Sequence, residues 1–243
     1  MAQPDTACFA DTITLIGGFN QTTSSTAGGV TTGTGVVAAG GTVAGQTYLP
    51  DGNGASYTTA VNISGFSGQT IIQGTDIAEV CLNIEHSYIG DLDITLTCPN
   101  GTSIYLMDAN AGAGPGNTFL GDAQDNFAIG NGVPGIGMDY CFDLGAAWGT
   151  MTAENIAGNY IPATVTPGNN ILTPGSFQPN QSFSGLIGCP IDGNWTITVT
   201  DNLNVDDGYI FEWSLLLNPA INPNSEFYTV NLLNGIWQSN PDS

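Results

Sequence analysis

The sequence of 243 residues contains no lysine and no arginine. These two residues normally supply about half of the charged residues of a soluble domain. Their absence removes the side chains that neutralise phosphates, contact guanine or attach a protein to anionic lipid. We therefore expect no nucleic-acid partner. No apolar run approaches the ~18 residues of a membrane-spanning helix, so we also expect no membrane insertion.

The chain is strongly acidic, because 21 Asp and Glu residues stand against a single His and give a formal net charge of −21. Such a surface repels itself unless cations screen it. Short carboxylates in loops are oxygen ligands that suit Ca²⁺. The acidity thus indicates either a surface that keeps the protein in solution or a specific cation site, and both interpretations remain open.

The pattern of apolar residues predicts an all-β protein. The composition combines 41% hydrophobic residues with 34 Gly and 13 Pro, which is typical of a turn-rich β protein with a core. No helix longer than a turn or two is indicated, and residues 146–156 are the best candidate for one. Alternating apolar and polar residues predict closely spaced strands, which favour a two-sheet sandwich; the main ones cover residues 57–66, 71–72, 77–84, 92–98, 103–107, 195–199 and 211–217.

The five cysteines fit no zinc signature, since no two of them form a C-x₂-C pair. In a secreted protein they would form part of a disulfide framework. Their spacing does not indicate which cysteine is bonded to which. The start Ala2-Gln3-Pro4-Asp5 resembles the residues that remain after signal cleavage in many secreted bacterial proteins. We therefore expect export and display at the cell surface. The disulfide candidates are Cys8, Cys81, Cys98, Cys141 and Cys189.

Two sequence blocks carry a family resemblance. Their ordered elements are a strand ending in His86, the corner Gly90-Asp91-Leu92, the turn Pro99-Asn100-Gly101-Thr102, the strand start Gly193-Asn194-Trp195, and Asp207-Gly208 before a closing strand with Trp213. This set resembles the P domain (P/Homo B domain) that follows the catalytic domain of kexin- and furin-like convertases. Tyr140-Cys141 and Gly188-Cys189-Pro190 are similar to elements of P-domain-like modules in large surface proteins of gliding and adhesive Bacteroidetes.

The resemblance implies a jelly-roll-like β-sandwich of the P-domain type over residues 55–218, with no active site of its own. An N-terminal Thr/Gly-rich β arm would cover residues 1–54, and a C-terminal extension or the start of a next domain residues 219–243. We expect the arm to be ordered, because Ile13-Thr14-Leu15-Ile16 is strand-like. It would pack on its own sandwich or on a neighbouring copy.

A calcium site is predicted where two groups of aspartates meet. Asp91 and Asp93 flank Leu92 at one strand end, and Asp201, Asp206 and Asp207 lie in a connection between two strands. If the strands run antiparallel as in P domains, both groups reach the same end of the sandwich. Converging carboxylates without Lys or Arg need a cation or costly protonation. The alternative is that Asp91 caps a hairpin by bonding backbone amides.

The P-domain arrangement also favours a Cys98–Cys189 disulfide, and Cys8 would then join the arm to Cys81 or Cys141. His86 would have a hydrogen-bonded packing role at the end of its core strand. Trp195 and Trp213 would be core anchors. The string Gly101-Thr102-Ser103 is also found at the nucleophile of subtilases, but here it lies in a predicted β-turn. We therefore expect no catalytic residue and no enzyme.

The sequence thus predicts a non-catalytic extracellular structural or adhesive module of a larger secreted surface protein, stabilised by Ca²⁺ and able to self-assemble. Its partners would be identical copies in a homo-oligomer, neighbouring domains, or a glycan or protein on a surface. Two alternatives remain open: an accessory domain of a secreted subtilisin-like protease, and a carbohydrate-binding module that uses exposed aromatic residues.

Overall fold

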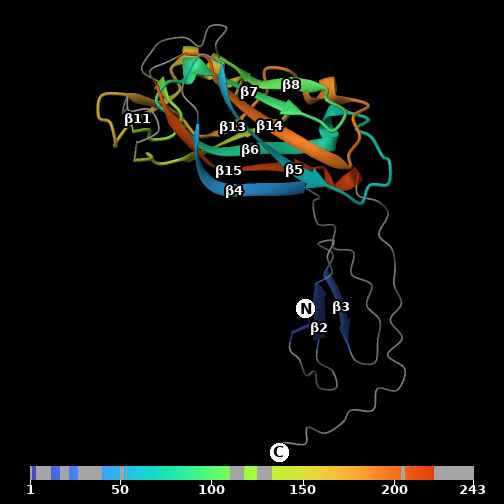
Figure 1. Ribbon diagram of the computed structural model, residues 1–243. Helices are drawn as coiled ribbons and strands as arrows, with labels where there is room; N and C mark the ends of the chain where they lie inside the picture. Colours follow the sequence, from blue (N-terminus) through green and yellow to red (C-terminus); the bar gives the residue numbers. More distant parts are fainter. Residues whose placement is uncertain are drawn as a thin grey trace, which may run out of the picture. The chain divides into compact units, whose positions relative to one another are not determined.

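The computed structural model describes residues 2–3, 12–16, 22–26, 40–49, 52, 54–109, 118–124, 133–203 and 206–221. The chain divides into two units, one made of Met1–Ala38 with Asn222–Ser243 and the other of Ala39–Ile221. The described strands of the first unit form a small antiparallel sheet of β1 (Ala2–Gln3), β2 (Thr12–Ile16) and β3 (Thr22–Thr26). The second unit contains the β-sandwich (Figure 1).

The first layer of the sandwich is a five-stranded sheet in the order β13-β10-β6-β15-β4. Only β10 and β13 run parallel to each other, and the other neighbours are antiparallel. Its strands are β13 (Gly175–Phe177), β10 (Met138–Phe142), β6 (Ile77–His86), β15 (Gly208–Leu217) and β4 (Gly40–Leu49).

The second layer is an antiparallel four-stranded sheet in the order β5-β14-β7-β8. Its strands are β5 (Ala55–Ile63), β14 (Gly193–Asp201), β7 (Leu92–Thr97) and β8 (Ser103–Asp108). A small further sheet contains β11 (Tyr160–Pro162), β12 (Asn170–Leu172) and β9 (Thr118–Phe119). Short 3₁₀ turns are η1 (Gly74–Asp76), η2 (Ile89–Asp91), η3 (Phe183–Leu186) and η4 (Pro219–Ile221).

The helix α1 spans Met151–Ala157 and begins later than the predicted range 146–156. The hydroxyl of Thr150 accepts a hydrogen bond from the N–H of Ala153, which satisfies a free donor at the helix start. Gly158 ends the helix with a left-handed φ of 79°, a conformation that glycine adopts without steric cost. These two residues fix the helix at two turns.

The core lies between the two sheets and contains both predicted tryptophan anchors. Trp195 of β14 and Trp213 of β15 are both buried, and the indole N–H of Trp195 donates to the carbonyl of Ile191 at 2.9 Å. The predicted strand 211–217 lies within β15, but its first residue, Phe211, is only half-buried. The pairing of β15 shifts register between Ile210 and Glu212, so the alternation breaks at this position.

The sandwich unit begins at Ala39, whereas the sequence placed the boundary at residue 55. The reason is β4, which pairs along β15 from Gly40 to Leu49 and so belongs to the five-stranded sheet. At the other end the unit closes at Ile221. Apart from β1, β2, β3 and β4, the predicted arm lies outside the described residues, and so does the extension after Ile221.

Candidate functional site

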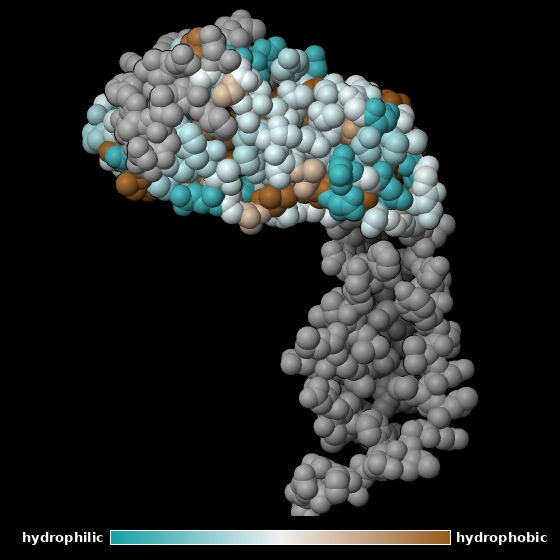
Figure 2. Space-filling model, in the orientation of Figure 1, coloured by the Kyte–Doolittle hydropathy of each residue, from teal (hydrophilic) through white to brown (hydrophobic). Residues whose placement is uncertain are grey.

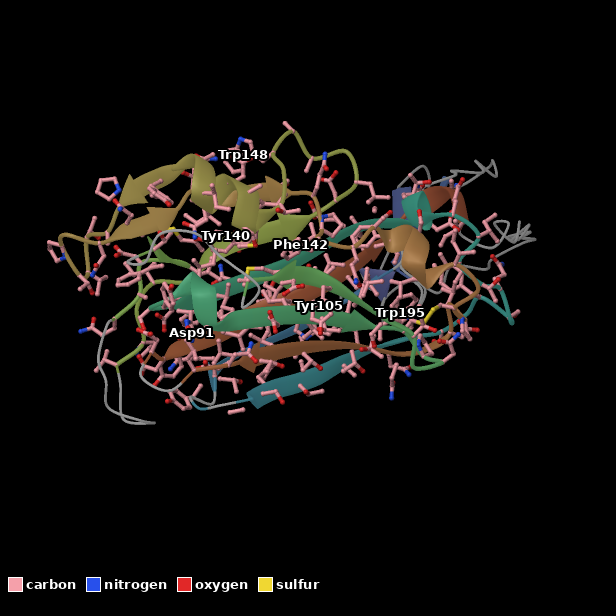
Figure 3. The ribbon with its side chains drawn as sticks, turned by 90° about the horizontal axis from the view of Figure 1, so that it is seen from above. Asp91, Tyr105, Tyr140, Phe142, Trp148 and Trp195 are labelled. Atoms are coloured by element: carbon pink, nitrogen blue, oxygen red, sulfur yellow. A yellow bond between two sulfur atoms is a disulfide. The ribbon has the colours of Figure 1, made fainter. Side chains whose placement is uncertain are left out.

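Strand register brings the predicted aspartates to one end of the sandwich. Asp201 pairs with Leu92, the residue after Asp91, and Gly208 pairs with His86. The backbone N–H of Asn202 donates to the carbonyl of Asp91 at 2.9 Å. Both groups of aspartates therefore reach the same end, as the antiparallel strands lead one to expect. Figure 3 shows Asp91 at the opposite end of the sandwich from Trp195.

Five ionisable side chains at this end are buried, and we call them the acidic cluster together with the neighbouring Asp206. Buried charges are rare unless they are paired. The chain has no Lys or Arg, so His86 is the one cationic side chain that can balance them. The buried members are Glu85, His86, Asp91, Asp201 and Asp207.

His86 occupies the end of β6 and is fully buried. Its Nδ1 lies 3.0 Å from the carbonyl oxygen of Tyr88. Its Nε2 lies 3.7 Å from a carboxylate oxygen of Asp201. Burial alone would lower the pKa of His86, but Asp201, followed by Asp91 and Asp206, raises the pKa above 6.5. The side chain therefore has the predicted hydrogen-bonded packing role, and the neighbouring carboxylates favour its protonated form.

Asp91 is a buried carboxylate that lies beside Asp206, His86 and Asp201. Its side chain is 0% exposed, and neither carboxylate oxygen has a hydrogen-bond donor within the described part of the chain. Burial, and after it the charge of Asp206, raises the pKa of Asp91 to about 7, while His86 lowers it. The alternative in which the Asp91 side chain caps a hairpin is not observed, because it is the main-chain carbonyl that accepts from Asn202.

The connection before β15 is tied to the end of β6 through Ser87. The Ser87 hydroxyl donates to a carboxylate oxygen of Asp206 at 3.1 Å, and the N–H of Asp207 donates to that hydroxyl at 3.1 Å. The N–H of Ser87 in turn donates to the carbonyl of Asp207 at 3.0 Å. These bonds hold Asp206 and Asp207 beside His86, so Ser87 is a positioning residue that the sequence did not indicate.

Two carboxylates differ from the prediction. Asp93 is half-buried, and its carboxylate accepts from the side-chain amide of Asn202 at 3.0 Å, so it lies at the margin of the cluster. Glu85 was not among the predicted metal ligands, but it is buried beside His86. Burial is the main cause that raises the pKa of Glu85 to about 7, with a smaller effect of Asp207. The sequence feature that could have identified Glu85 as part of the cluster is its position next to His86.

The carboxylates of the acidic cluster are neighbours, but no three of these described residues have oxygen atoms all within 4.8 Å of one another. Within the described residues, the one group of three potential metal ligands with atoms all within 4.8 Å of one another is Glu79, Cys81 and Cys141. Cys81 and Cys141 form a disulfide and offer no thiolate, which is the form that binds metals. A cation at the acidic end would therefore have to draw Asp91, Asp201 and Asp206 closer together.

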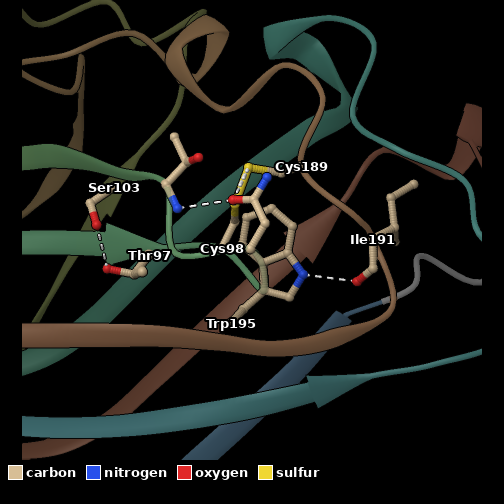
Figure 4. The surroundings of a disulfide bond; sticks show 8 residues. Thr97, Cys98, Ser103, Cys189, Ile191 and Trp195 are labelled. Atoms are coloured by element: carbon tan, nitrogen blue, oxygen red, sulfur yellow. Dashed lines mark hydrogen bonds between the residues drawn. A yellow bond between two sulfur atoms is a disulfide. The ribbon is translucent and has the colours of Figure 1, made fainter.

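Two disulfides are present in the described residues. Cys98 and Cys189 are joined as predicted, with a Cα–Cα distance of 6.2 Å (Figure 4). They lie beside Trp195, and the Asn100 side chain closes the adjoining turn by accepting from the N–H of Thr102. The second bond joins Cys81 to Cys141. The predicted link from Cys8 to either of these residues was therefore wrong, and Cys8 itself lies outside the described residues.

The Gly-Thr-Ser string has a structural role. Ser103 begins β8, and its hydroxyl shares a hydrogen bond of 2.9 Å with the hydroxyl of Thr97 at the end of β7 (Figure 4). Asp91 lies at the other end of β7, just before Leu92 begins the strand, and His86 at the end of β6 lies near it. Ser103 is thus separated from the one histidine, and the pair needed for a serine nucleophile does not form.

A shallow groove lies beside β10, lined by Asn83, Gly137, Met138, Asp139, Pro174 and Gly175. Its polar groups are already engaged, since the Asn83 amide donates to Asp139 at 2.7 Å. Trp148 packs against Phe177 with ring centroids 5.1 Å apart and the rings tilted by 50°. Tyr105 is an exposed aromatic residue, and the carbohydrate-binding alternative stays a prediction.

Within the described residues, no helix has the length and apolar character to cross a membrane. A comparison with curated proteins gives no match. Residues 76–129 match the family model described as the proprotein convertase P-domain. This segment holds His86, the Gly90-Asp91-Leu92 corner and the turn after Cys98. The unit of residues 39–221 is therefore a β-sandwich, and its residues 76–129 are similar to the P-domain family, as the resemblance predicted.

Proposed function

We propose that this chain is a non-catalytic accessory module of a larger secreted protein, and that Ca²⁺ bound at the acidic cluster stabilises it. The P-domain match supports the non-catalytic role. The observation that carries the calcium site is the buried Asp91 carboxylate, which has no N–H donor among the described residues and lies beside the acid Asp206, in a sequence without Lys or Arg.

A buried carboxylate can be stabilised by a proton or by a cation. Protonation suffices only below the raised pKa of about 7 for Asp91. At higher pH the ionised Asp91 needs a positive charge nearby. His86 alone cannot balance Asp91 and the other buried acids of the cluster. Ca²⁺ accepts six to eight oxygen ligands in flexible geometry, whereas Mg²⁺ demands a near-ideal octahedron. The carboxylates here come from three places, which are η2, β14 and the residues just before β15. Such a set suits Ca²⁺ better than Mg²⁺, because Ca²⁺ tolerates irregular geometry.

The test is calcium titration of the chelator-treated chain at pH 8, followed by calorimetry and by thermal unfolding. At 100-fold excess over Kd, a ligand that binds only the folded state adds about 2.7 kcal/mol, which corresponds to a rise in Tm of roughly 5–10 °C at this chain length. Asp91→Asn should abolish the binding heat and most of this rise.

The matched control is Asp139→Asn, since Asp139 is exposed and lies outside the acidic cluster. It should bind calcium as the wild type does. A wild-type chain that shows no heat of calcium binding and the same Tm with and without chelator would overturn the calcium proposal.

Extracellular display is supported by the two disulfides, because such bonds persist in oxidising compartments. The proposed structural or adhesive role at a surface is supported by the two disulfides and by the separation of Ser103 from His86 in the described residues. The name of the matching family favours a second candidate, an accessory domain of a secreted subtilisin-like protease. Isolation of the full-length protein from its source would decide, since a subtilisin-like catalytic domain in the same polypeptide would favour the second candidate.

A further inference from the structure

Two of the four sheet edges in the sandwich are covered by the chain itself. Beyond β8, the N–H groups of Asn180 and Gln181 donate to the carbonyls of Leu106 and Tyr105, both at 2.9 Å. Beyond β13, Trp148 forms a β-bridge with Phe177. The backbone groups on this flank therefore have partners, and another strand cannot be added here without displacing these segments.

The opposite flank is open in the described part of the chain. Here β4 and β5 are the terminal strands of their sheets, and no described segment pairs with their outer sides. The two strands approach closely, because a Cβ atom added at Gly41 would lie 2.1 Å from Cγ1 of Val61. Figure 1 shows both strands along the same side of the sandwich. An unpaired strand edge is a template for another strand.

Of these two edges, β5 is the one suited to pairing. Its nine residues match β14 without any shift of register, from Ala55 to Ile63. By contrast, β4 is irregular opposite the step from Ile210 to Glu212, and its Gly45 has φ 140°. Bulges, charged residues and proline are three of the means by which proteins block edge pairing. The β5 strand contains none of the three.

The charge distribution indicates the partner. Between Thr12 and Thr75 the sequence has one charged residue, Asp51, although the whole chain carries −21. An equally acidic second copy can approach most easily where this charge is missing. Figure 2 shows weakly polar residues in pale shades over the middle of the face on which β5 lies. The exposed side chains of β5 include Thr58, Ala60 and Asn62.

We propose that two copies of this chain associate through their β5 strands, which pair antiparallel about a two-fold axis near Thr59. The two four-stranded sheets then continue into each other across the interface. A two-fold contact uses the same surface on both copies, and a single strand edge meets this requirement. With the axis at Thr59, Thr58 of one copy faces Ala60 of the other.

The test measures the solution mass of residues 1–243 by light scattering over a range of concentrations. The wild type should reach twice the monomer mass. Thr58→Glu combined with Ala60→Glu places like charges opposite each other across the axis, and it should return the protein to the monomer mass. Circular dichroism and Tm establish that the variant is folded.

The matched control is Thr42→Glu with Ala44→Glu, which adds the same charge at exposed positions of β4. This variant should remain dimeric. The proposal is overturned by a wild type that stays monomeric at all concentrations, by a β5 variant that is folded and still dimeric, or by a dimer that only the β4 variant breaks. Measurements with calcium and with chelator separate it from the calcium proposal, since the β5 contact contains no metal ligand.

Discussion

Glu85 illustrates how a single residue in the acidic cluster couples protonation to folding. It lies on β6 next to His86 and is buried. Its pKa rises from 4.5 to about 7, chiefly because burial disfavours the charged form. The folded state thus holds the proton more tightly than the unfolded chain. The stability that protonated Glu85 contributes is complete below about pH 4.5, and it is lost as the pH rises through about 7.

We therefore expect the chelator-treated protein to have a higher Tm at pH 5 than at pH 8. The raised pKa values of Asp91 and His86 act in the same direction. Glu85→Gln, which is neutral at both pH values, should reduce the difference in Tm. Differential scanning calorimetry at a series of pH values measures it.

The control for this prediction is Glu212→Gln, because Glu212 is an exposed glutamate on β15. It should leave the pH dependence as in the wild type, whose overall negative charge contributes to the difference as well. An equal reduction in both variants would show that overall charge, and not the burial of Glu85, sets the pH dependence.

At the scale of elements, strands whose polar and apolar faces alternate were predictable. In β7 and β14 the buried residues alternate with half-buried ones, as a strand with one face on a core requires. β4 was not predicted as part of the sandwich, since its Gly- and Thr-rich sequence has little periodicity and its place depends on pairing with β15. The predicted strand at Ile71-Ile72 is wrong, because Ile71 pairs with the loop at Cys189 and Ile72 is 72% exposed.

The sequence predicted the end of the sandwich at which the candidate site lies, but not all of the residues that form it. Asp91 and Asp201 could be placed at one end because antiparallel register is a property of the family fold. Ser87 could not, since its role depends on how the loop before β15 packs against it. For Glu85 the sequence offered its position beside His86, but its burial depends on the segments of Gln124 and Gly135 that bond to it. The Cys98–Cys189 bond followed from the P-domain arrangement. The pairing of Cys81 with Cys141 required the register of β6 against β10, where the two residues face each other.

At the scale of the whole molecule, the unit Ala39–Ile221 contains both sheets, both disulfides and the acidic cluster. Its core joins residues of both layers, from Leu49 to Leu217. The unit therefore has the elements that an independent domain needs.

We expect a fragment of residues 39–221 to fold alone, with a Tm within a few degrees of the full chain, and to keep the response to calcium. A fragment of residues 50–221 is the control, because it lacks β4 and leaves the backbone groups and apolar surface of β15 without their partner. It should unfold at a markedly lower temperature. If both fragments unfolded at the same temperature, β4 would contribute little. If neither folded, the unit made of Met1–Ala38 with Asn222–Ser243 would be required for the sandwich itself.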